Sequence, residues 1–105
     1  MNKLSEFNYL NDLYDIYRLL LTKRQILVMD NYYKFNLSLS EISSNLKISR
    51  SAVLDCLKHA RKKLKEYEKK LHLLSKNNKI KEILKNSEIE ENVKKNILEE
   101  LYYGV

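Results

Sequence analysis

The sequence predicts an all-α protein, and three observations support that fold class. The chain of 105 residues contains no proline and one glycine, so it is poor in the residues that turn strands into hairpins. Apolar residues recur every three or four positions along most of its length, which is the period of a helix with one buried face. Ser or Thr stands three places before Glu or Gln at Thr22, Ser38 and Ser87, a pattern that opens helices. We therefore expect helices joined by short polar turns.

The first predicted helix runs from the N-terminus to about Leu21. Its apolar residues form one stripe with a second beside it: Leu4, Phe7, Leu10, Tyr14, Tyr17 and Leu21, then Leu13, Ile16 and Leu20. This arc is wider than a surface helix needs, so the helix is either central or shared with a second subunit. Tyr9, Tyr14 and Tyr17 could stack on bases, but their helical spacing favours a core or an interface.

The second predicted helix opens at the Thr22 and Gln25 capping box and extends to about Lys34. Ile26, Met29, Tyr32 and Tyr33 are available for burial on it, and residues 35–37 form the exit turn.

A short third helix and a long fourth helix follow. Ser38 and Glu41 form another capping box, and Leu39, Ile42 and Leu46 mark the inward face of about two turns. After a turn at Lys47, Ser49 caps a helix that we expect to run to about Ser75. Its apolar residues keep a strict heptad: Val53, Leu57, Ala60, Leu64, Tyr67, Leu71 and Leu74. The later part of this seam needs a partner, either the C-terminal helices or a second copy of the chain.

The C-terminal part begins with a polar stretch at 76–79, which we expect to separate helices. Ile80, Ile83 and Leu84 then mark a short helix, and Ser87 with Glu90 forms the third capping box. The last helix carries Ile89, Val93, Ile97, Leu98 and Leu101 and ends at Gly104 as its C-cap. We therefore divide the chain into a helix-turn-helix domain with a long fourth helix, 1–75, and a C-terminal helical extension, 76–105.

Residues 39–60 have the pattern of a helix-turn-helix, in which the second helix lies across the first and can enter a major groove. The net charge of the chain is +6, and residues 38–75 carry nine basic and four acidic residues. Such a charge excess favours an anionic partner. The predicted nucleic-acid-binding residues are Ser49, Arg50, Ser51, Lys58, Arg61, Lys62 and Lys65. Leu54 and Asp55 interrupt this face, and the turn has Lys47 where glycine is common. A purely structural or protein-docking helix-turn-helix is the alternative.

Catalytic and metal sites are not expected. His59 and His72 lie far apart without clustered ligands, and one terminal glycine cannot build a phosphate-binding loop. Cys56 is expected to be a half-buried filler rather than a reactive thiolate. We predict no enzyme activity and no cofactor. The unpaired cysteine, the absence of a signal pattern and of a long apolar run predict a cytoplasmic protein without membrane insertion. The basic run 61–65 could touch anionic lipid, but its leucine seam favours a helix partner.

Residues 14–71 resemble the YlxM family of small bacterial proteins, whose core is similar to the DNA-binding region 4 of sigma factors. The resemblance rests on LLT-x-x-Q at 20–25, LSLSEI at 37–42, and ISRSAV at 48–53, followed by a basic segment and E-x-x-L at 68–71. It implies a winged-helix-like three-helical core without catalytic residues. It also implies that the gene lies beside those of the signal recognition particle GTPases and that the protein has a role in that pathway. Family members often carry acidic residues where this chain has Ser44 and Asn45.

Two functional hypotheses follow. The first is a regulatory, nucleic-acid-binding accessory factor, acting as a homodimer on DNA or on the RNA of the signal recognition particle. The motif itself favours DNA, because the major groove of A-form RNA is too deep and narrow for a helix. The second is a protein-interaction module that docks on a GTPase of the signal recognition particle without binding nucleic acid.

Overall fold

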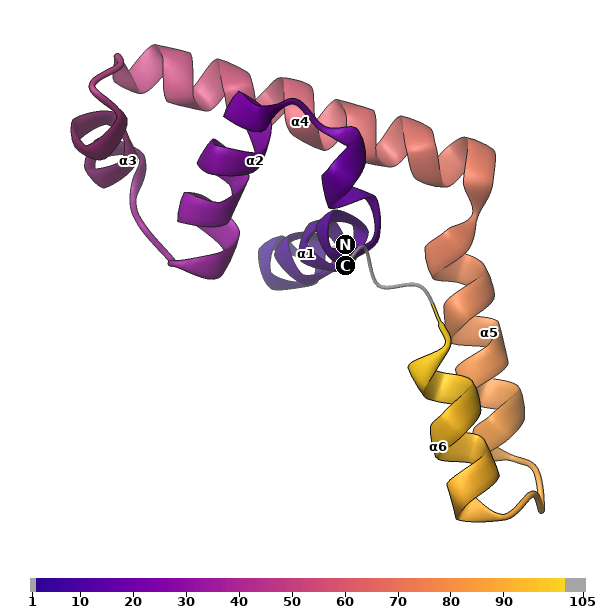
Figure 1. The fold of residues 1–105 in the computed structure, drawn as a ribbon. Coiled ribbons are helices and arrows are strands. Elements are labelled where there is room, and N and C mark those ends of the chain that lie inside the picture. The colour runs from indigo at the N-terminus through magenta and orange to yellow at the C-terminus, as the bar shows by residue number, and fades with distance from the viewer. Residues whose placement is uncertain (1, 102–105) are drawn as a thin grey trace.

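The fold is entirely helical over residues 2–101, which are the residues that this computed structural model describes. Within that range lie six α-helices: α1 (Lys3–Tyr17), α2 (Lys23–Met29), α3 (Leu39–Leu46), α4 (Arg50–Leu71), α5 (Leu73–Lys85) and α6 (Glu91–Glu99) (Figure 1). A 3₁₀ turn, Arg18–Leu20, follows α1, and a π-helical turn, Asp30–Lys34, follows α2. The predicted all-α fold class is confirmed.

One core lies between α4 and the three helices before it, with α4 crossing above them (Figure 1). Helix α1 is central to this core. Leu13, Tyr14, Ile16 and Tyr17 are buried, so most of the wide apolar arc of the first helix is covered within the chain, although Leu4 and Leu20 are exposed. A second subunit is not needed to bury the covered part.

The heptad seam of α4 also faces this core. Val53, Leu57, Ala60 and Leu64 are fully buried in the cluster that α1, α2 and α3 complete. The expectation that the C-terminal helices or a second copy cover the later part of the seam was therefore wrong for Leu64 and Tyr67, which pack in the same cluster. The reason is that α1 and α2, although earlier in the chain, pack along most of the length of α4.

Two of the three predicted capping boxes are present. Thr22 and Gln25 close one at the start of α2, and Ser38 and Glu41 close the other at the start of α3. The third was wrong. Glu90, without a side-chain cap, precedes α6, and the Ser87 hydroxyl donates to the carbonyl of Leu84 instead. This serine closes the end of α5 rather than opening α6.

The long helix ends four residues earlier than expected. Helix α4 stops at Leu71, His72 adopts the left-handed conformation (φ 56°, ψ 29°), and α5 begins at Leu73. Residues 76–79, expected to separate helices, lie inside α5. The nearest helix boundary to the predicted division after Ser75 is thus this elbow at His72. The division into two domains stays a prediction, and the predicted C-cap at Gly104 lies outside the described residues.

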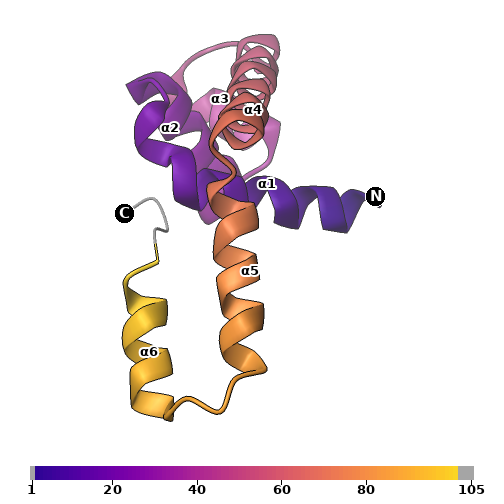
Figure 2. The ribbon, with the colours of Figure 1, turned by 90° about the vertical axis from the view of Figure 1, so that its right-hand side faces the viewer.

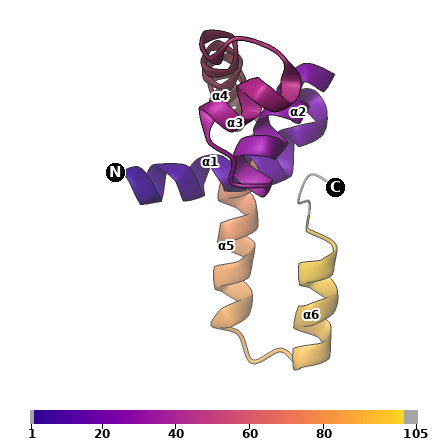
Figure 3. The ribbon, with the colours of Figure 1, turned by 90° about the vertical axis from the view of Figure 1, so that its left-hand side faces the viewer.

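Helices α5 and α6 form an antiparallel hairpin that points away from the rest of the molecule. The views of Figures 1, 2 and 3 all place this hairpin beyond the body formed by α1 to α4. Leu84 of α5 is buried, whereas no residue of α6 is. The body and the hairpin therefore differ sharply in how much apolar surface they bury.

Candidate nucleic-acid interface

The helix-turn-helix consists of α3, the turn at 47–49 and α4. The Glu41 amide donates to the Ser38 hydroxyl (3.1 Å), and the Ser38 amide donates back to the Glu41 carboxylate (3.0 Å). At the start of α4, the Ala52 amide donates to the hydroxyl of Ser49 (3.0 Å). These caps satisfy amide groups that have no partner within the helix. They fix where both helices begin and hence how the two cross.

The turn holds its shape through contacts back to α3. The Ile48 amide donates to the carbonyl of Ser43 (3.2 Å), and the Ser43 hydroxyl donates to the carbonyl of Ile48. Lys47 adopts the left-handed conformation at φ 56° and ψ 44°. The helix-turn-helix pattern predicted this position as one that favours glycine. A side chain with a Cβ atom costs about 1 kcal/mol there.

Lys47→Gly is therefore expected to raise the free energy of unfolding by about 0.5–1 kcal/mol, because the relief of left-handed strain exceeds the added chain entropy of glycine. The measurement is urea unfolding followed by circular dichroism. Ser44→Gly, an exposed position within α3, is the matched control and is expected to lower stability by a similar amount. A loss of stability in both variants would contradict the strain argument.

With its seam buried, α4 turns the opposite side to solvent. Ser49, Arg50, Ser51, Lys58, Lys62 and Lys65 are all exposed there. Asp55 is exposed among them, and Leu54 is half-buried. The structure thus gathers six of the seven predicted residues on accessible positions of one helix and its cap. The hydroxyl of Ser49 accepts a hydrogen bond from Ala52 and can still donate its own proton to a phosphate.

Arg61, the seventh predicted residue, has a different environment. Its Nε–H donates to the Tyr33 hydroxyl (3.0 Å), and its guanidinium lies 5.3 Å from the ring centroid of Tyr32 and 5.8 Å from that of Tyr33. Burial raises the pKa of Tyr33, against the opposing effect of Arg61, so its hydroxyl stays an acceptor and donor without charge. Arg61 therefore packs α4 against the π-helical turn that follows α2. Its loss would disturb this packing as well as remove a charge.

Lys65 forms a contact that can open. Its ammonium pairs with the Glu6 carboxylate at 3.0 Å, and both side chains are largely exposed. Surface pairs of this kind contribute about 0–1 kcal/mol. A phosphate group can therefore compete for Lys65, whereas Lys58 and Lys62 form no ion pair among the described residues.

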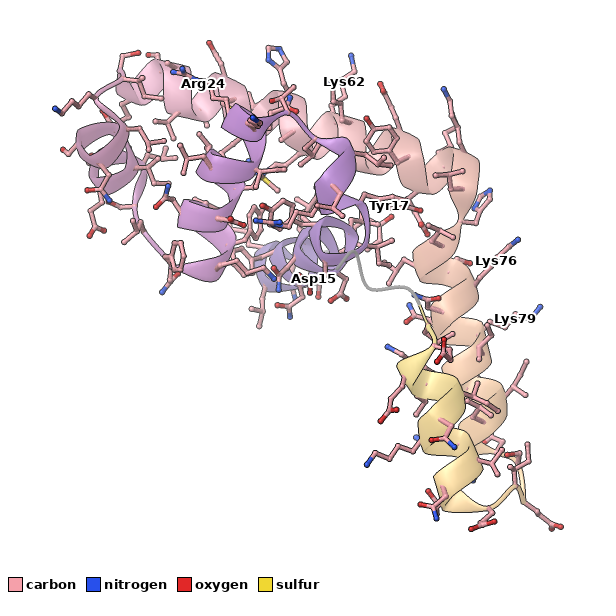
Figure 4. The ribbon with its side chains drawn as sticks, in the orientation of Figure 1. Asp15, Tyr17, Arg24, Lys62, Lys76 and Lys79 are labelled. Carbon is pink, nitrogen blue, oxygen red and sulfur yellow. The ribbon has the colours of Figure 1, made fainter. Side chains whose placement is uncertain are left out.

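Arg24 is a cation that the sequence analysis did not assign to this surface. It is exposed near the start of α2, and Figure 4 shows it at the same edge of α4 as Lys62. It is close enough to α4 to lower the pKa of Cys56 against the larger effect of burial. Nothing in the sequence could place it there, since the two residues are 38 positions apart and the α2–α4 packing brings them together.

Past the elbow, Lys76 and Lys79 project from α5 on the outer side of the bend between α4 and α5, whereas Asp15 lies on its inner side (Figure 4). These two lysines lie on the hairpin rather than on the helix-turn-helix. The cationic face considered for nucleic acid is therefore the face of α4 together with Arg24.

The remaining candidates offer little chemistry. His59 and His72 are exposed, and no group of three His, Cys, Asp or Glu side chains that could hold a metal occurs within residues 2–101. Cys56 is half-buried as predicted, and burial raises the pKa of its thiol, which disfavours the nucleophilic thiolate. Over the same residues, no helix has both the length and the apolar character that crossing a membrane requires.

Comparison with known proteins agrees with this architecture. Residues 4–102 match the family UPF0122, described as "Putative helix-turn-helix protein, YlxM / p13 like". The chain is 45% identical over 75 residues to a UPF0122 protein of Halalkalibacterium halodurans, a stretch covering 71% of this chain and 69% of that protein. It is 47% identical over 68 residues to one of Clostridium novyi, covering 65% and 59%, and 41% identical over 73 residues to one of Lactococcus lactis, covering 70% and 66%. The matched stretches thus span about two thirds of these relatives.

The chain belongs to the UPF0122 family of YlxM/p13-like helix-turn-helix proteins. The resemblance identified from the motifs between residues 14 and 71 is confirmed, and so is the helix-turn-helix.

Proposed function

We propose that this UPF0122 protein binds nucleic acid as a non-enzymatic regulatory factor, through the outer face of α4 and its N-terminal cap. The single observation that carries the proposal is the set of exposed cations and hydroxyls on one helix whose opposite side is held rigidly by the core. Arg50, Lys58 and Lys62 supply charge for phosphates, while the hydroxyls of Ser49 and Ser51 supply hydrogen-bond donors. The start of α4 adds its positive helix-dipole end.

Arg50 is the candidate for a base contact, since the first residues of a recognition helix reach furthest into a groove. Lys58 and Lys62 lie one turn apart and would follow the phosphate backbone, with Lys65 joining after release from Glu6. Arg24 extends the same face from α2. Leu54 and Asp55 limit close contact in the middle of the helix, so we expect the ends of this face to carry most of the affinity.

We further propose that this role belongs to the signal recognition particle pathway in the cytoplasm, with the RNA of the particle or a DNA operator as the partner; the family resemblance supports this proposal. The two differ in shape: α4 fits the wide major groove of B-DNA, whereas an A-form RNA offers its minor groove, its loops and its phosphates. A homodimer, in which two such helices act together, is part of the same proposal.

The test is a titration of the purified chain against a mixed-sequence DNA duplex and against the particle RNA at two salt concentrations. Lys58→Ala combined with Lys62→Ala is expected to weaken binding about tenfold and to reduce the salt slope by about 2, because two phosphate contacts and their counterions are lost. Both side chains are exposed, so folding should be unaffected.

The control is Lys85→Ala combined with Lys95→Ala, which removes the same charge from exposed positions of the hairpin. Equal weakening by both pairs would show that net charge alone drives binding and would contradict an interface on α4. No binding of the unmodified chain to either nucleic acid at low salt would overturn the proposal in favour of docking on a GTPase of the particle.

A further inference from the structure

The hairpin of α5 and α6 buries too few apolar residues to account for the stability of its two helices. Helix α6 has nine residues and buries none of them. Isolated helices shorter than about 12–15 residues are marginal in water, and most helical stability in proteins comes from packing an apolar face. A helix with an apolar face and no burial therefore indicates surface that another element covers.

Both helices contribute to that uncovered surface. Ile80 and Ile83 are exposed on α5, with Ile83 exposed to 59%, and Ile89, Val93 and Ile97 are exposed on or just before α6. The spacing within each set is three or four residues, so each set lies along one side of its helix. We call these five residues the hairpin face.

The two sets lie on the same flank of the hairpin. The opposite flank is a groove of about 750 Å³ with a polar rim, lined by Lys81, Leu84, Lys85, Glu91, Lys94, Lys95, Leu98 and Glu99. On α5, Ile80 and Ile83 lie on the far side of Leu84 from Lys81 and Lys85. On α6, Val93 and Ile97 lie on the far side of Leu98 from Lys95 and Glu99. Charged side chains therefore surround the groove, although much of its lining surface is apolar, whereas all five residues of the hairpin face are apolar.

Charge on the hairpin is segregated between α5 and the segment that contains α6. Helix α5 contains four lysines and one glutamate, a net charge of +3, whereas residues 88–100 contain five glutamates and two lysines, a net charge of −3. Helix α6 itself has two glutamates and two lysines, and the flanking residues Glu88, Glu90 and Glu100 carry the negative excess. The residues that flank the hairpin face follow the same division. Lys76 and Lys79 lie one turn from Ile80 and Ile83, and Glu90 and Glu100 lie three residues from Val93 and Ile97.

We propose that the hairpin face binds the same face of a second copy of this chain, with α5 of each copy against α6 of the other. A two-fold axis makes an interface self-complementary, so each patch must fit itself. This hairpin does so, because the rotation sets a helix of net charge +3 on a segment of net charge −3 at both ends. Lys76 at the start of α5 in one copy then lies level with Glu100 after α6 in the other, while Lys79 and Glu90 add to the opposite charges of the two segments. The four helices enclose the isoleucines and valines of both hairpin faces.

This arrangement moves the expected dimer contact away from the long seam of α4, which the core of the chain already buries. It leaves the outer face of α4 free in both copies. The elbow at His72 then links each helix-turn-helix to a shared bundle, and the two α4 helices are held at a fixed separation.

The first test is the mass of the full chain in solution by sedimentation equilibrium at micromolar concentration. We expect twice the chain mass of 12.6 kDa. Ile83→Glu, which puts a charge into the hairpin face, is expected to raise the dissociation constant at least tenfold. Leu19→Glu is the matched control, since Leu19 is exposed to 55% on the body, and we expect it to leave the mass unchanged. A monomeric unmodified chain, or equal effects of the two variants, would overturn the proposal.

Charge reversal tests the pairing itself. Lys76→Glu with Lys79→Glu changes the net charge of α5 from +3 to −1, and Glu90→Lys with Glu100→Lys changes that of residues 88–100 from −3 to +1. Each double variant is expected to be largely monomeric alone, and an equimolar mixture is expected to form a heterodimer. Recovery in the mixture also shows that both variants are folded. A mixture that stays monomeric while both chains keep native helicity would overturn the pairing of α5 with α6, and self-association of either variant alone would do the same.

Discussion

Glu68→Ala is expected to lower the free energy of unfolding by about 3 kcal/mol, because this one carboxylate holds the elbow between α4 and α5. Its Oε1 accepts the hydroxyl of Tyr17 at 2.6 Å and the amide of Leu74 at 3.0 Å, and its Oε2 accepts the amide of Ser75 at 3.1 Å. The amide of Leu73 donates to the Tyr17 hydroxyl at 3.1 Å. The first amides of α5 thus find their partners on α1 and α4.

Removing the carboxylate leaves the amides of Leu74 and Ser75 and the buried phenol of Tyr17 without these acceptors. Hydrogen bonds to a charged group contribute about 1.5–3 kcal/mol each, and these three share one side chain, so their losses do not simply add. Glu68→Gln keeps the shape and part of the acceptor capacity, and we expect about half the loss. The measurement is urea unfolding followed by circular dichroism, with hydrogen exchange of the Leu74 and Ser75 amides as the local readout.

Glu66→Ala is the control, because Glu66 is exposed two residues earlier on the same helix. Its effect should stay within about 0.5 kcal/mol. If Glu68→Ala destabilises no more than Glu66→Ala and the two amides keep their protection, the elbow is held by packing alone. If only the two amides lose protection, the carboxylate holds α5 without contributing to the body.

The sequence predicted the elements whose signals are local. The capping boxes at Thr22 and Ser38 and the cap at Ser49 each lie within four residues of the groups that they satisfy. The left-handed residue at Lys47 was likewise predicted, because glycine is common at this position of the motif. The fold class and the helix-turn-helix follow from these signals together with the apolar period.

The elbow could not be predicted, because its causes lie far apart in the sequence. His72 is neither glycine nor proline, and the heptad continues across it to Leu74. The helix breaks there since Tyr17, 51 positions before Glu68, joins that carboxylate in capping a new helix. Periodicity correctly identified Val53, Leu57, Ala60 and Leu64 as buried, but it also included Leu71, which is exposed at the elbow, and it could not say which helices cover the seam.

The candidate site likewise contains some residues whose positions follow from the local sequence and others whose positions depend on distant packing. Exposure of Lys58 and Lys62 follows from the helical period once the seam is known. The packing of Arg61 on Tyr32 and Tyr33 depends on where α2 ends, and the position of Arg24 depends on where it begins. A binding test that removes Arg61 would therefore mix two effects. Lys58 and Lys62 separate phosphate contact from stability more cleanly.

The chain is also expected to lose stability steeply between pH 10 and pH 12, beyond what its lysines cause, because of buried tyrosines. Burial, and then the hydrogen bond to Glu68, raise the pKa of Tyr17 to about 12. Burial and the contact with Asp30 raise the pKa of Tyr14 as well. In the unfolded chain both groups titrate near pH 10.

The direction of the effect follows from proton counting. Below pH 10 both states hold these protons, and the free energy of unfolding does not depend on them. From pH 10 to pH 12 the unfolded chain releases the Tyr17 proton while the folded chain keeps it, so unfolding becomes more favourable as the pH rises. One such group lowers the free energy of unfolding by up to about 1.4 kcal/mol per pH unit, or by about 3 kcal/mol between pH 10 and pH 12.

Tyr17→Phe removes this pH dependence but also the hydrogen bond to Glu68. It should therefore be less stable than the unmodified chain at pH 8, and the gap should narrow as the pH rises to 11. Urea unfolding at pH 8, 9, 10 and 11 measures both curves, and the shared titration of lysines cancels in their difference. Tyr67→Phe is the control, because it loses a hydroxyl bonded to the carbonyl of Leu20 but keeps the Tyr17–Glu68 contact. The difference in free energy of unfolding between Tyr67→Phe and Tyr17→Phe is therefore expected to narrow as the pH rises. A constant gap between Tyr17→Phe and the unmodified chain would mean that the phenol ionises equally well in both states. The Tyr17–Glu68 contact would then not exclude water, and the rigid elbow that sets the direction of α5 would lose its physical basis.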